Sequence, residues 1–384
     1  MKIHLLLFMS LFLVSCSKKI TINNSIPIRY NGHINLDVKV EDKIYGNFVF
    51  DTGVPGLVLD SLFCKKNRLD YKTNEIEIGG IGNSTKAAQL ITDTIHYELN
   101  NKEYHFSTPT VMLNLKDMVD KNINGILGIN TFGQKPYMID YVSKKIIFTD
   151  SIKGYENIYA EADNAKIYLN LSITLKNGKK IQGRFLLDTG SNETILNSHV
   201  FVTDGIYNST DKKKFFAKGG IGGDSNGYFL PVSAIEIGKF KLKNLIVSVS
   251  TDSLGMLANS DYMGIIGNDL LDDFNIIFNY QKGKIWVKPN KNFNKNKRKL
   301  FRCISFQDMG EKWTVAGIVE DSEAFRQGVR MNDQVIEVNN IPVEKMDLDK
   351  FTDKLKANEE LHLKIKRENE EKEIKFKLNV FMKS

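Results

Sequence analysis

The chain has 384 residues, of which 42% are hydrophobic and 26% are charged. This length predicts two or three domains, and the hydrophobic fraction is too high for a chain that is disordered throughout. The net charge of +7 comes from 53 basic and 46 acidic residues spread thinly along the sequence, so we expect no nucleic-acid partner. The three cysteines, Cys16, Cys64 and Cys303, fit neither a zinc spacing nor a disulfide framework, and we expect Cys64 to be a buried apolar residue.

The N-terminus resembles the signal of bacterial lipoproteins. A basic Lys2 precedes a short apolar run, and Leu13-Val14-Ser15-Cys16 then matches the lipobox of that family. The run is too short for a helix that spans the hydrocarbon core of a membrane. The resemblance implies that residues 1–15 are removed as a signal peptide and that Cys16 is lipidated. Residues 16–33 are then a tether, and the protein is held at the bacterial cell envelope, on the periplasmic side or the cell surface. A plain secretory signal is the alternative.

A unit of about 120 residues occurs twice, at 34–150 and at 163–288. Each copy begins with an alternating apolar and polar strand, followed by a turn and a second apolar strand that runs into an aspartate. In the second copy the turn is an Asn-Gly pair, which favours a hairpin. Two copies of this size predict a pseudo-symmetric pair of β lobes with a cleft between them, rather than a solenoid.

Both copies carry Asp-Thr-Gly at the end of the apolar strand, at residues 51–53 and 188–190. An apolar-apolar-Gly triplet follows each at a similar distance and ends at Gly128 and Gly267. This pattern resembles the aspartic peptidases, both the single-lobed retroviral type and the two-lobed pepsin type. The resemblance covers roughly residues 30–288 and implies a mainly β fold in which the two lobes form one active site.

The resemblance makes Asp51 and Asp188 the catalytic residues. Two adjacent carboxyl groups that share one proton can act as base and acid toward a water molecule, because like charges so close cannot both ionise. Such an enzyme needs no cofactor and no metal, and the six histidines show no metal-binding spacing. Since both aspartates lie in one chain, we expect a monomer with an intramolecular dyad.

The neighbouring residues are expected to support the two active-site loops. In the family, hydroxyls of Thr52 and Thr189 hydrogen-bond across to the opposite lobe. Gly53 and Gly190 let the backbone approach the neighbouring carboxylate. Ser191 is expected to hydrogen-bond its carboxylate as in pepsin-type lobes. The first copy has Val54 instead, which withholds that hydroxyl. We therefore expect Asp51 to hold the shared proton and Asp188 to be the base.

Two Gly-Gly-Ile-Gly segments lie in register with the repeats, where the family carries its flaps; ordinary hairpin turns are the alternative. The flap candidates are Gly79, Gly80, Gly82, Gly219, Gly220 and Gly222. The tyrosine of pepsin-type flaps is absent from residues 75–82, and nearby Tyr71 is the candidate substitute. These departures favour the retroviral-like branch, here duplicated within one chain.

Residues 289–299 are rich in Asn and Lys and predict a linker, followed by a small α/β domain at 300–384. Ser322 and Asp347 are expected to cap the N-termini of two helices in this domain. Few apolar residues lie in the linker, so we expect this domain to fold independently of the lobes. Its sequence resembles the PDZ domains of bacterial envelope proteases. The matching residues are Val319, Ser322, Ala324, Gly328, Asp333, Val335, Ile336 and Asn339.

PDZ domains bind an extended peptide as an added strand. The resemblance therefore implies a peptide ligand, with Arg302, Cys303 and Ile304 as groove candidates. Cys303 stands where the family usually has glycine, which puts capture of a peptide C-terminus in doubt. The sequence as a whole predicts a lipid-anchored endopeptidase that acts on a protein or peptide substrate. The alternatives are a non-catalytic peptide-binding lipoprotein with degenerate lobes, and an enzyme that must dimerise.

Overall fold

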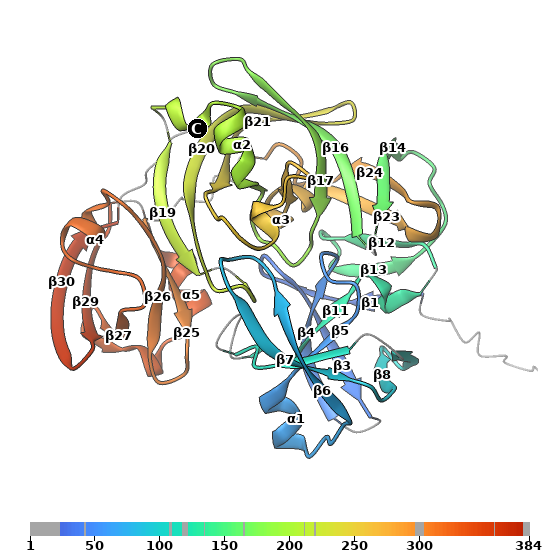
Figure 1. The fold of residues 1–384 in the computed structure, drawn as a ribbon, viewed down its shortest axis with the longest axis horizontal. Helices are drawn as coiled ribbons and strands as arrows, with labels where there is room; N and C mark the ends of the chain where they lie inside the picture. Colours follow the sequence, from blue (N-terminus) through green and yellow to red (C-terminus); the bar gives the residue numbers. More distant parts are fainter. Residues whose placement is uncertain are drawn as a thin grey trace, which may run out of the picture.

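The computed structural model describes residues 24–41, 44–106, 110–116, 122–133, 135–163, 166–210, 212–218, 220–295, 303–356 and 358–378. Cys16, Gly219 and Arg302 lie outside these ranges. The described chain is mainly β, as predicted, and forms two lobes and a C-terminal module (Figure 1). Within the described residues, no helix has the length and apolar character needed to cross a membrane.

The first lobe is built on one sheet with the strand order β6-β7-β10-β5-β11-β4-β3-β8-β9. Its central strands β5 and β11 are buried along their whole length, whereas β3 near one end alternates between buried and half-exposed or exposed positions over its second half. This contrast is expected, because a strand in the middle of a covered sheet is apolar on both faces. The elements are β2 (Arg29–Tyr30), β3 (Ile34–Val40), β4 (Ile44–Asp51), β5 (Leu57–Asp60), α1 (Ser61–Asn67), β6 (Thr73–Gly79), β7 (Thr85–Ile91), β8 (Ile95–Leu99), β9 (Lys102–Phe106), β10 (Thr110–Leu113), β11 (Gly125–Gly128) and η1 (Ile129–Phe132).

The second lobe repeats this arrangement. Strands β17 and β22 pair in parallel, as β4 and β11 do in the first lobe. Its elements are β15 (Ala160–Asp163), β16 (Lys166–Leu175), β17 (Lys180–Leu187), β18 (Ile195–Leu196), α2 (Ser198–Thr203), η2 (Ile206–Asn208), β19 (Lys213–Lys218), β20 (Asp224–Ile237), β21 (Phe240–Ser250), η3 (Met256–Ala258), β22 (Gly264–Ile266) and α3 (Asn268–Leu271).

A six-stranded sheet joins the two lobes, with the order β1-β13-β12-β23-β24-β14. At its centre β12 of the first lobe pairs with β23 of the second, and the rings of Tyr137 and Phe278 stack with centroids 5.1 Å apart. Both side chains are fully buried, so this sheet fixes the lobes to each other through apolar packing. The elements are β1 (Ser25–Pro27), β12 (Tyr137–Asp140), β13 (Lys145–Phe148), β14 (Glu156–Ile158), β23 (Phe274–Asn279), η4 (Tyr280–Lys282) and β24 (Lys284–Pro289).

The C-terminal module has its own core around Trp313, separate from the core of the lobes. Two of its helices begin as the sequence predicts, because Ser322 and Asp347 accept hydrogen bonds from the first turns of α4 and α5. The elements are β25 (Ile304–Asp308), β26 (Trp313–Val319), α4 (Glu323–Arg326), β27 (Gln334–Val338), β28 (Ile341–Pro342), η5 (Val343–Lys345), α5 (Leu348–Lys354), β29 (Glu360–Arg367) and β30 (Glu370–Lys377).

Three connecting segments are more ordered than the sequence suggests. The predicted tether contains β1 and β2, and β1 pairs with β13. The polar connection between the repeats contains β14 and β15, which pair with β24 and β16. In the predicted linker, the ring of Phe293 packs 5.4 Å from that of Phe274. Polar segments of this kind are ordered here because an adjacent strand or aromatic ring offers them backbone or apolar partners.

The module nevertheless contacts the second lobe through a strand pair that the sequence does not predict. Strand β19 of the second lobe pairs antiparallel with β26 of the module, so one sheet runs through both (Figure 1). Phe215 of β19 is buried in the module's core. This contact lies far from the linker in sequence, which is why the linker composition does not reveal it.

Candidate active site

Asp51 and Asp188 occupy equivalent places in the two lobes. Asp51 is the last residue of β4, where it pairs with Gly128 of the parallel strand β11. Asp188 follows β17, in which Leu187 pairs with Ile266, and the Asp188 N–H donates to the Ile266 carbonyl oxygen at 3.0 Å. The duplicated strand pair therefore delivers one carboxyl group from each lobe to the interface between the lobes.

Two buried threonines hydrogen-bond these loops to each other across the interface. The Thr52 hydroxyl donates to the Leu187 carbonyl oxygen at 2.8 Å and accepts from the Thr189 N–H at 3.0 Å. The Thr189 hydroxyl donates to the Phe50 carbonyl oxygen at 2.8 Å and accepts from the Thr52 N–H at 3.1 Å. Both side chains have no exposed surface. These four crossed bonds form the arrangement that the sequence predicts for the two threonines.

The glycines of the two triplets leave room for the carboxyl groups. Each donates its N–H to the aspartate of its own lobe, at 2.7 Å from Gly53 to Asp51 and 2.8 Å from Gly190 to Asp188. A Cβ atom on Gly53 would lie 2.9 Å from Cγ of Asp188, and one on Gly190 would lie closer still to Cγ of Asp51. Each carboxyl group therefore packs against the glycine of the opposite lobe, at a distance that no other residue permits.

The pKa values of both aspartates are raised, but the contributions to the two shifts differ. Burial and then the charge of Asp188 hold the pKa of Asp51 well above its ordinary value of 3.8. Burial also raises the pKa of Asp188, but hydrogen bonds from Asp51, Gly190 and Ser191 oppose that rise. The two carboxyl groups face each other across the interface, since each packs against the glycine beside the other. A single proton shared by the pair, and held by Asp51, accounts for these directions.

The strands that follow lie directly beneath the active-site loops. A Cβ atom on Gly128 would lie 2.3 Å from the carbonyl oxygen of Val54, and one on Gly267 would lie 2.4 Å from that of Glu193. A side chain at either position would collide with the loop above it, so glycine lets the later strand pass beneath each loop.

The expected role of Ser191 is wrong in its detail. Its hydroxyl donates to the Glu193 carbonyl oxygen at 2.7 Å, and its backbone N–H donates to the Asp188 carbonyl oxygen at 3.3 Å, as the Val54 N–H does to that of Asp51. Val54 therefore withholds no hydroxyl from Asp51 that the second lobe supplies to Asp188. The backbone donors near the two carboxyl groups are matched, with Gly53 and Val54 in the first lobe and Gly190 and Ser191 in the second. The inequality of the two pKa values therefore comes from the interaction between the carboxyl groups.

The two Gly-rich segments form the tips of hairpins that meet each other. One hairpin is β6–β7 and the other is β19–β20. The Ser84 N–H and hydroxyl both donate to the Gly222 carbonyl oxygen, at 2.9 and 2.7 Å. A Cβ atom on Gly82 would lie 2.5 Å from that same oxygen, and one on Gly80 would lie 3.0 Å from Cβ of Ile221. Gly79 and Gly220 have no such close neighbour.

The isoleucine of each tip crosses to the opposite lobe. Ile221 packs against the apolar cluster of the first lobe that also contacts Val54, three residues after Asp51. Ile81 packs against the cluster of the second lobe formed around Leu186 and Ile265. The two hairpin tips therefore meet each other, and each packs on the apolar cluster of the opposite lobe.

Two polar contacts near the site are not predicted by the sequence analysis. Asn83 at the first tip donates to Asp252 of the second lobe at 2.8 Å, and its carbonyl oxygen accepts from the Ser253 N–H at 2.9 Å. Asp252 is buried and also accepts from the Ser225 hydroxyl at 2.7 Å. The only sequence signal was an asparagine directly after the first Gly-rich segment.

The second contact is centred on Asn268. Its amide donates to the carbonyl oxygens of Thr189 and Gly32, at 2.7 and 2.8 Å, and its own oxygen accepts from the Tyr141 hydroxyl at 3.0 Å. The side chain has no exposed surface. Asn268 directly follows the second apolar-apolar-Gly triplet, where the first copy has Ile129, so the repeat itself marks the position as unusual.

Two other candidates take no part in the site. Tyr71 donates its hydroxyl to Glu41 at 3.3 Å and packs on the main core, so it does not replace a flap tyrosine. Cys64 is buried, as predicted, and burial together with the charge of Asp60 raises the pKa of its thiol to about 12. A thiol with this pKa is not a nucleophile at neutral pH.

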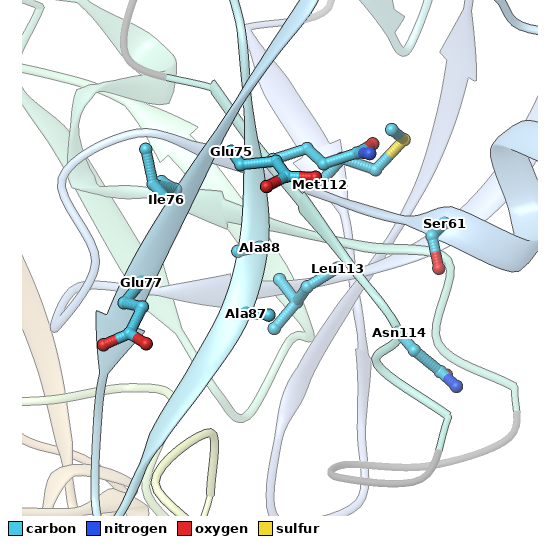
Figure 2. Close-up of a pocket in the computed structure, with 10 residues that line it drawn as sticks. Ser61, Glu75, Ile76, Glu77, Ala87, Ala88, Met112, Leu113 and Asn114 are labelled. Atoms are coloured by element: carbon cyan, nitrogen blue, oxygen red, sulfur yellow. The ribbon is translucent and has the colours of Figure 1, made fainter.

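A hollow of about 660 Å³ lies beside the first hairpin, between β6, β7 and β10 (Figure 2). Neither aspartate is among the described residues that line it. The lining residues are Ser61, Glu75, Ile76, Glu77, Ala87, Ala88, Gln89, Met112, Leu113 and Asn114. Over the described ranges, no group of three or more His, Cys, Asp or Glu side chains is placed to hold a metal ion.

In the C-terminal module, the predicted groove residues Cys303 and Ile304 have buried side chains that belong to the module's core. They can therefore offer a ligand only backbone groups. Beside β25, the rings of Phe306 and Phe351 lie 6.5 Å apart, which places α5 against this strand. Strand β25 and the side of α5 are thus the elements at which a peptide would add.

Comparison with known families supports this part of the chain. The sequence model described as PDZ domain matches residues 303–378. A comparison with curated proteins found no match for this chain.

The crossed threonine bonds predict a sharp difference between two buried threonines. Thr52→Val should lower the free energy of unfolding by about 2–4 kcal/mol, because it leaves the Leu187 carbonyl and the Thr189 N–H unpaired. Thr110 is a matched control, since it is equally buried but its hydroxyl has no partner in the described structure. Thr110→Val should change stability by less than about 1 kcal/mol. Equal losses in urea unfolding would contradict a special role for Thr52.

The raised pKa of Asp51 predicts how stability changes with pH. Between 3.8 and the raised value, the folded state holds a proton that the unfolded state releases. Wild-type stability should therefore fall as pH rises through this window, by up to about 1.4 kcal/mol per pH unit. Asp51→Asn cannot release this proton, so its stability relative to wild type should increase from pH 4 to pH 7. A difference that stays constant with pH in chemical denaturation would contradict the raised pKa.

Proposed function

We propose that this protein is an aspartic-type endopeptidase that hydrolyses peptide bonds through Asp51, Asp188 and an activated water molecule. The observation that carries the proposal is the pair of facing carboxyl groups, supplied by two equivalent lobes and held by crossed threonine bonds. A purely structural pair of buried acids would be costly, because both pKa values are raised by burial. Such perturbed groups cluster at functional sites.

The two carboxyl groups are suited to different steps. Asp188 accepts a proton from the water, whose oxygen attacks the carbonyl carbon of the substrate. Asp51, which holds the shared proton, donates a hydrogen bond to the carbonyl oxygen as negative charge develops there. The proton on Asp188 then passes to the departing nitrogen as the C–N bond breaks. The two groups exchange one proton and need no cofactor.

The surroundings fit an extended protein or peptide substrate. The hairpin tips meet each other and present backbone groups, and the apolar clusters of the two lobes are joined to them by Ile81 and Ile221. The dyad is completed within one chain, so we propose a monomer. A second peptide site is proposed in the PDZ domain, at the edge of β25 beside α5.

The dyad is tested by cleavage of a mixed peptide library across pH. Asp51→Asn and Asp188→Asn should each reduce cleavage by roughly 10³-fold or more, and the two losses should not add. The wild-type rate should form a bell in pH, because one carboxyl must be protonated and the other ionised. The upper limb of the bell should lie above 3.8, since the pKa of Asp51 is raised.

Two controls sharpen this experiment. Asp261→Asn changes an exposed aspartate of the second lobe and should leave cleavage unaltered. Val54→Ser should leave the pH profile in place, because the serine hydroxyl at the matching position of the second lobe turns to a backbone carbonyl. If the wild type cleaves nothing and binds peptides as well as both Asn variants do, the protein is a peptide-binding lipoprotein with degenerate lobes.

We also propose that the protein is anchored at the bacterial cell envelope through lipid on Cys16. The support is the lipobox in the sequence, and several acyl chains hold a protein stably on a bilayer. Cys16→Ala should move the protein to the soluble fraction or stall its processing, whereas Ser17→Ala should not. Retention of Cys16→Ala on membranes after a high-salt wash would contradict the proposed anchor.

A further inference from the structure

The second flap hairpin belongs to two structures at once. Its outer strand β19 lies between β20, its partner in the hairpin, and β26 of the PDZ domain. The Glu320 N–H donates to the Lys214 carbonyl oxygen at 2.9 Å where this ladder begins. The paired residues are Phe215 with Val319, Phe216 with Ile318, and Ala217 with Gly317.

Side chains strengthen this contact on both faces of the ladder. Phe215 is 8% exposed, belongs to the core of the PDZ domain, and stacks on Phe229 of β20 with centroids 4.3 Å apart. On the other face, the rings of Phe216 and Phe325 are stacked 6.5 Å apart. Lys214 forms an ion pair with Glu320 at 3.3 Å. A strand held by backbone pairing, aromatic packing and charge does not separate freely.

The far end of the same hairpin meets the tip of the first flap. Its tip carries Gly222, which accepts both hydrogen bonds from Ser84 of the first flap, and Ile221, which packs beside the first active-site loop. An extended substrate can reach the two aspartates only if the tips part. The second tip cannot move away without straining or breaking the ladder between β19 and β26, because its own strand is fixed there.

Strand β26 also connects this ladder to the peptide edge of the PDZ domain. Ile318 pairs with Phe216 of β19 on one side and with Ile304 of β25 on the other. The edge at which a peptide would add is therefore separated from the flap strand by two hydrogen-bonded strands. A change in the position of β25 or β26 acts directly on β19.

We propose that the PDZ domain is an autoinhibitory clamp, which holds the second flap in its closed position through the β19–β26 ladder. The clamp is a separate proposal from the peptidase activity. It concerns the opening of the second hairpin, and it does not require that Asp51 and Asp188 cleave peptides. Release of β19 from β26 opens the cleft to substrate.

Amide hydrogen exchange of the full chain tests the clamp without reference to activity. Phe216→Ala removes the ring that stacks on Phe325, and should accelerate exchange of the amides of residues 224–230 by about five- to twentyfold. Lys214→Glu should accelerate the same amides by a smaller factor, and Glu320→Lys in the same chain should restore slow exchange. Restoration by the exchanged charges excludes a general loss of folding as the cause.

Two control variants act within the PDZ domain but away from the ladder. Lys364→Ala removes an ion pair with Glu371, and Lys372→Ala removes an ion pair with Glu370. Neither should change exchange at residues 224–230. The clamp is overturned if Phe216→Ala leaves this exchange within twofold of wild type, or if both control variants accelerate it equally.

Cleavage supplies a second readout. With the clamp released, Phe216→Ala should raise kcat/KM for a peptide substrate, because entry requires the tips to part. A fall in kcat/KM despite faster exchange would overturn the inhibitory direction of the clamp. If neither wild type nor variant cleaves any peptide, the proposed peptidase activity fails, and the exchange measurements alone decide whether the clamp exists.

Discussion

The structure depends on the crossed hydrogen bonds between Thr52 and Thr189. Each hydroxyl pairs with a carbonyl and an N–H of the opposite lobe, so four backbone groups that would otherwise be buried without partners are satisfied at once. This constraint fixes the distance between the loops, and the carboxyl groups follow because each aspartate is the neighbour of a threonine. The raised pKa of Asp51 is therefore a consequence of geometry that the threonines impose. The glycine after each threonine then admits the opposite carboxyl group.

Around this centre, the two lobes are alike in backbone and unlike in side chains. The parallel strand pairs and the close approaches at Gly128 and Gly267 repeat almost unchanged. Asn268 has no polar counterpart in the first lobe, where Ile129 stands, and it binds the loop of Asp188 alone. The second flap is attached to the PDZ domain, whereas the first is held at its tip by Asp252. The candidate site thus has two differently restrained sides.

Most of the local structure was predictable because it follows from short-range patterns. The alternation of apolar and polar residues predicted β3 and β16, and the Asn-Gly pair predicted the turn between β16 and β17. Ser322 and Asp347 predicted where two helices begin. The hydroxyl of Ser191 was assigned to the wrong acceptor, because a side chain's choice between a carboxylate and a nearby carbonyl depends on a loop conformation that the residue type does not specify. The order in the tether and linker was missed for a related reason. Their partners are strands and rings distant in sequence.

The sequence by itself determined the duplication, the two Asp-Thr-Gly triplets, the Gly-rich hairpin tips and the PDZ domain at its C-terminus. Each of these features is a motif of particular residue types at fixed spacing, and each depends only on residues close together in the sequence. Only the tertiary structure decided that the two hairpin tips touch, that Asn83 reaches a buried Asp252, and that β19 joins the PDZ domain to the lobes. The physical reason is that an edge strand pairs through its backbone, which every residue shares. The sequence of β19 therefore carries no mark of the strand that it joins.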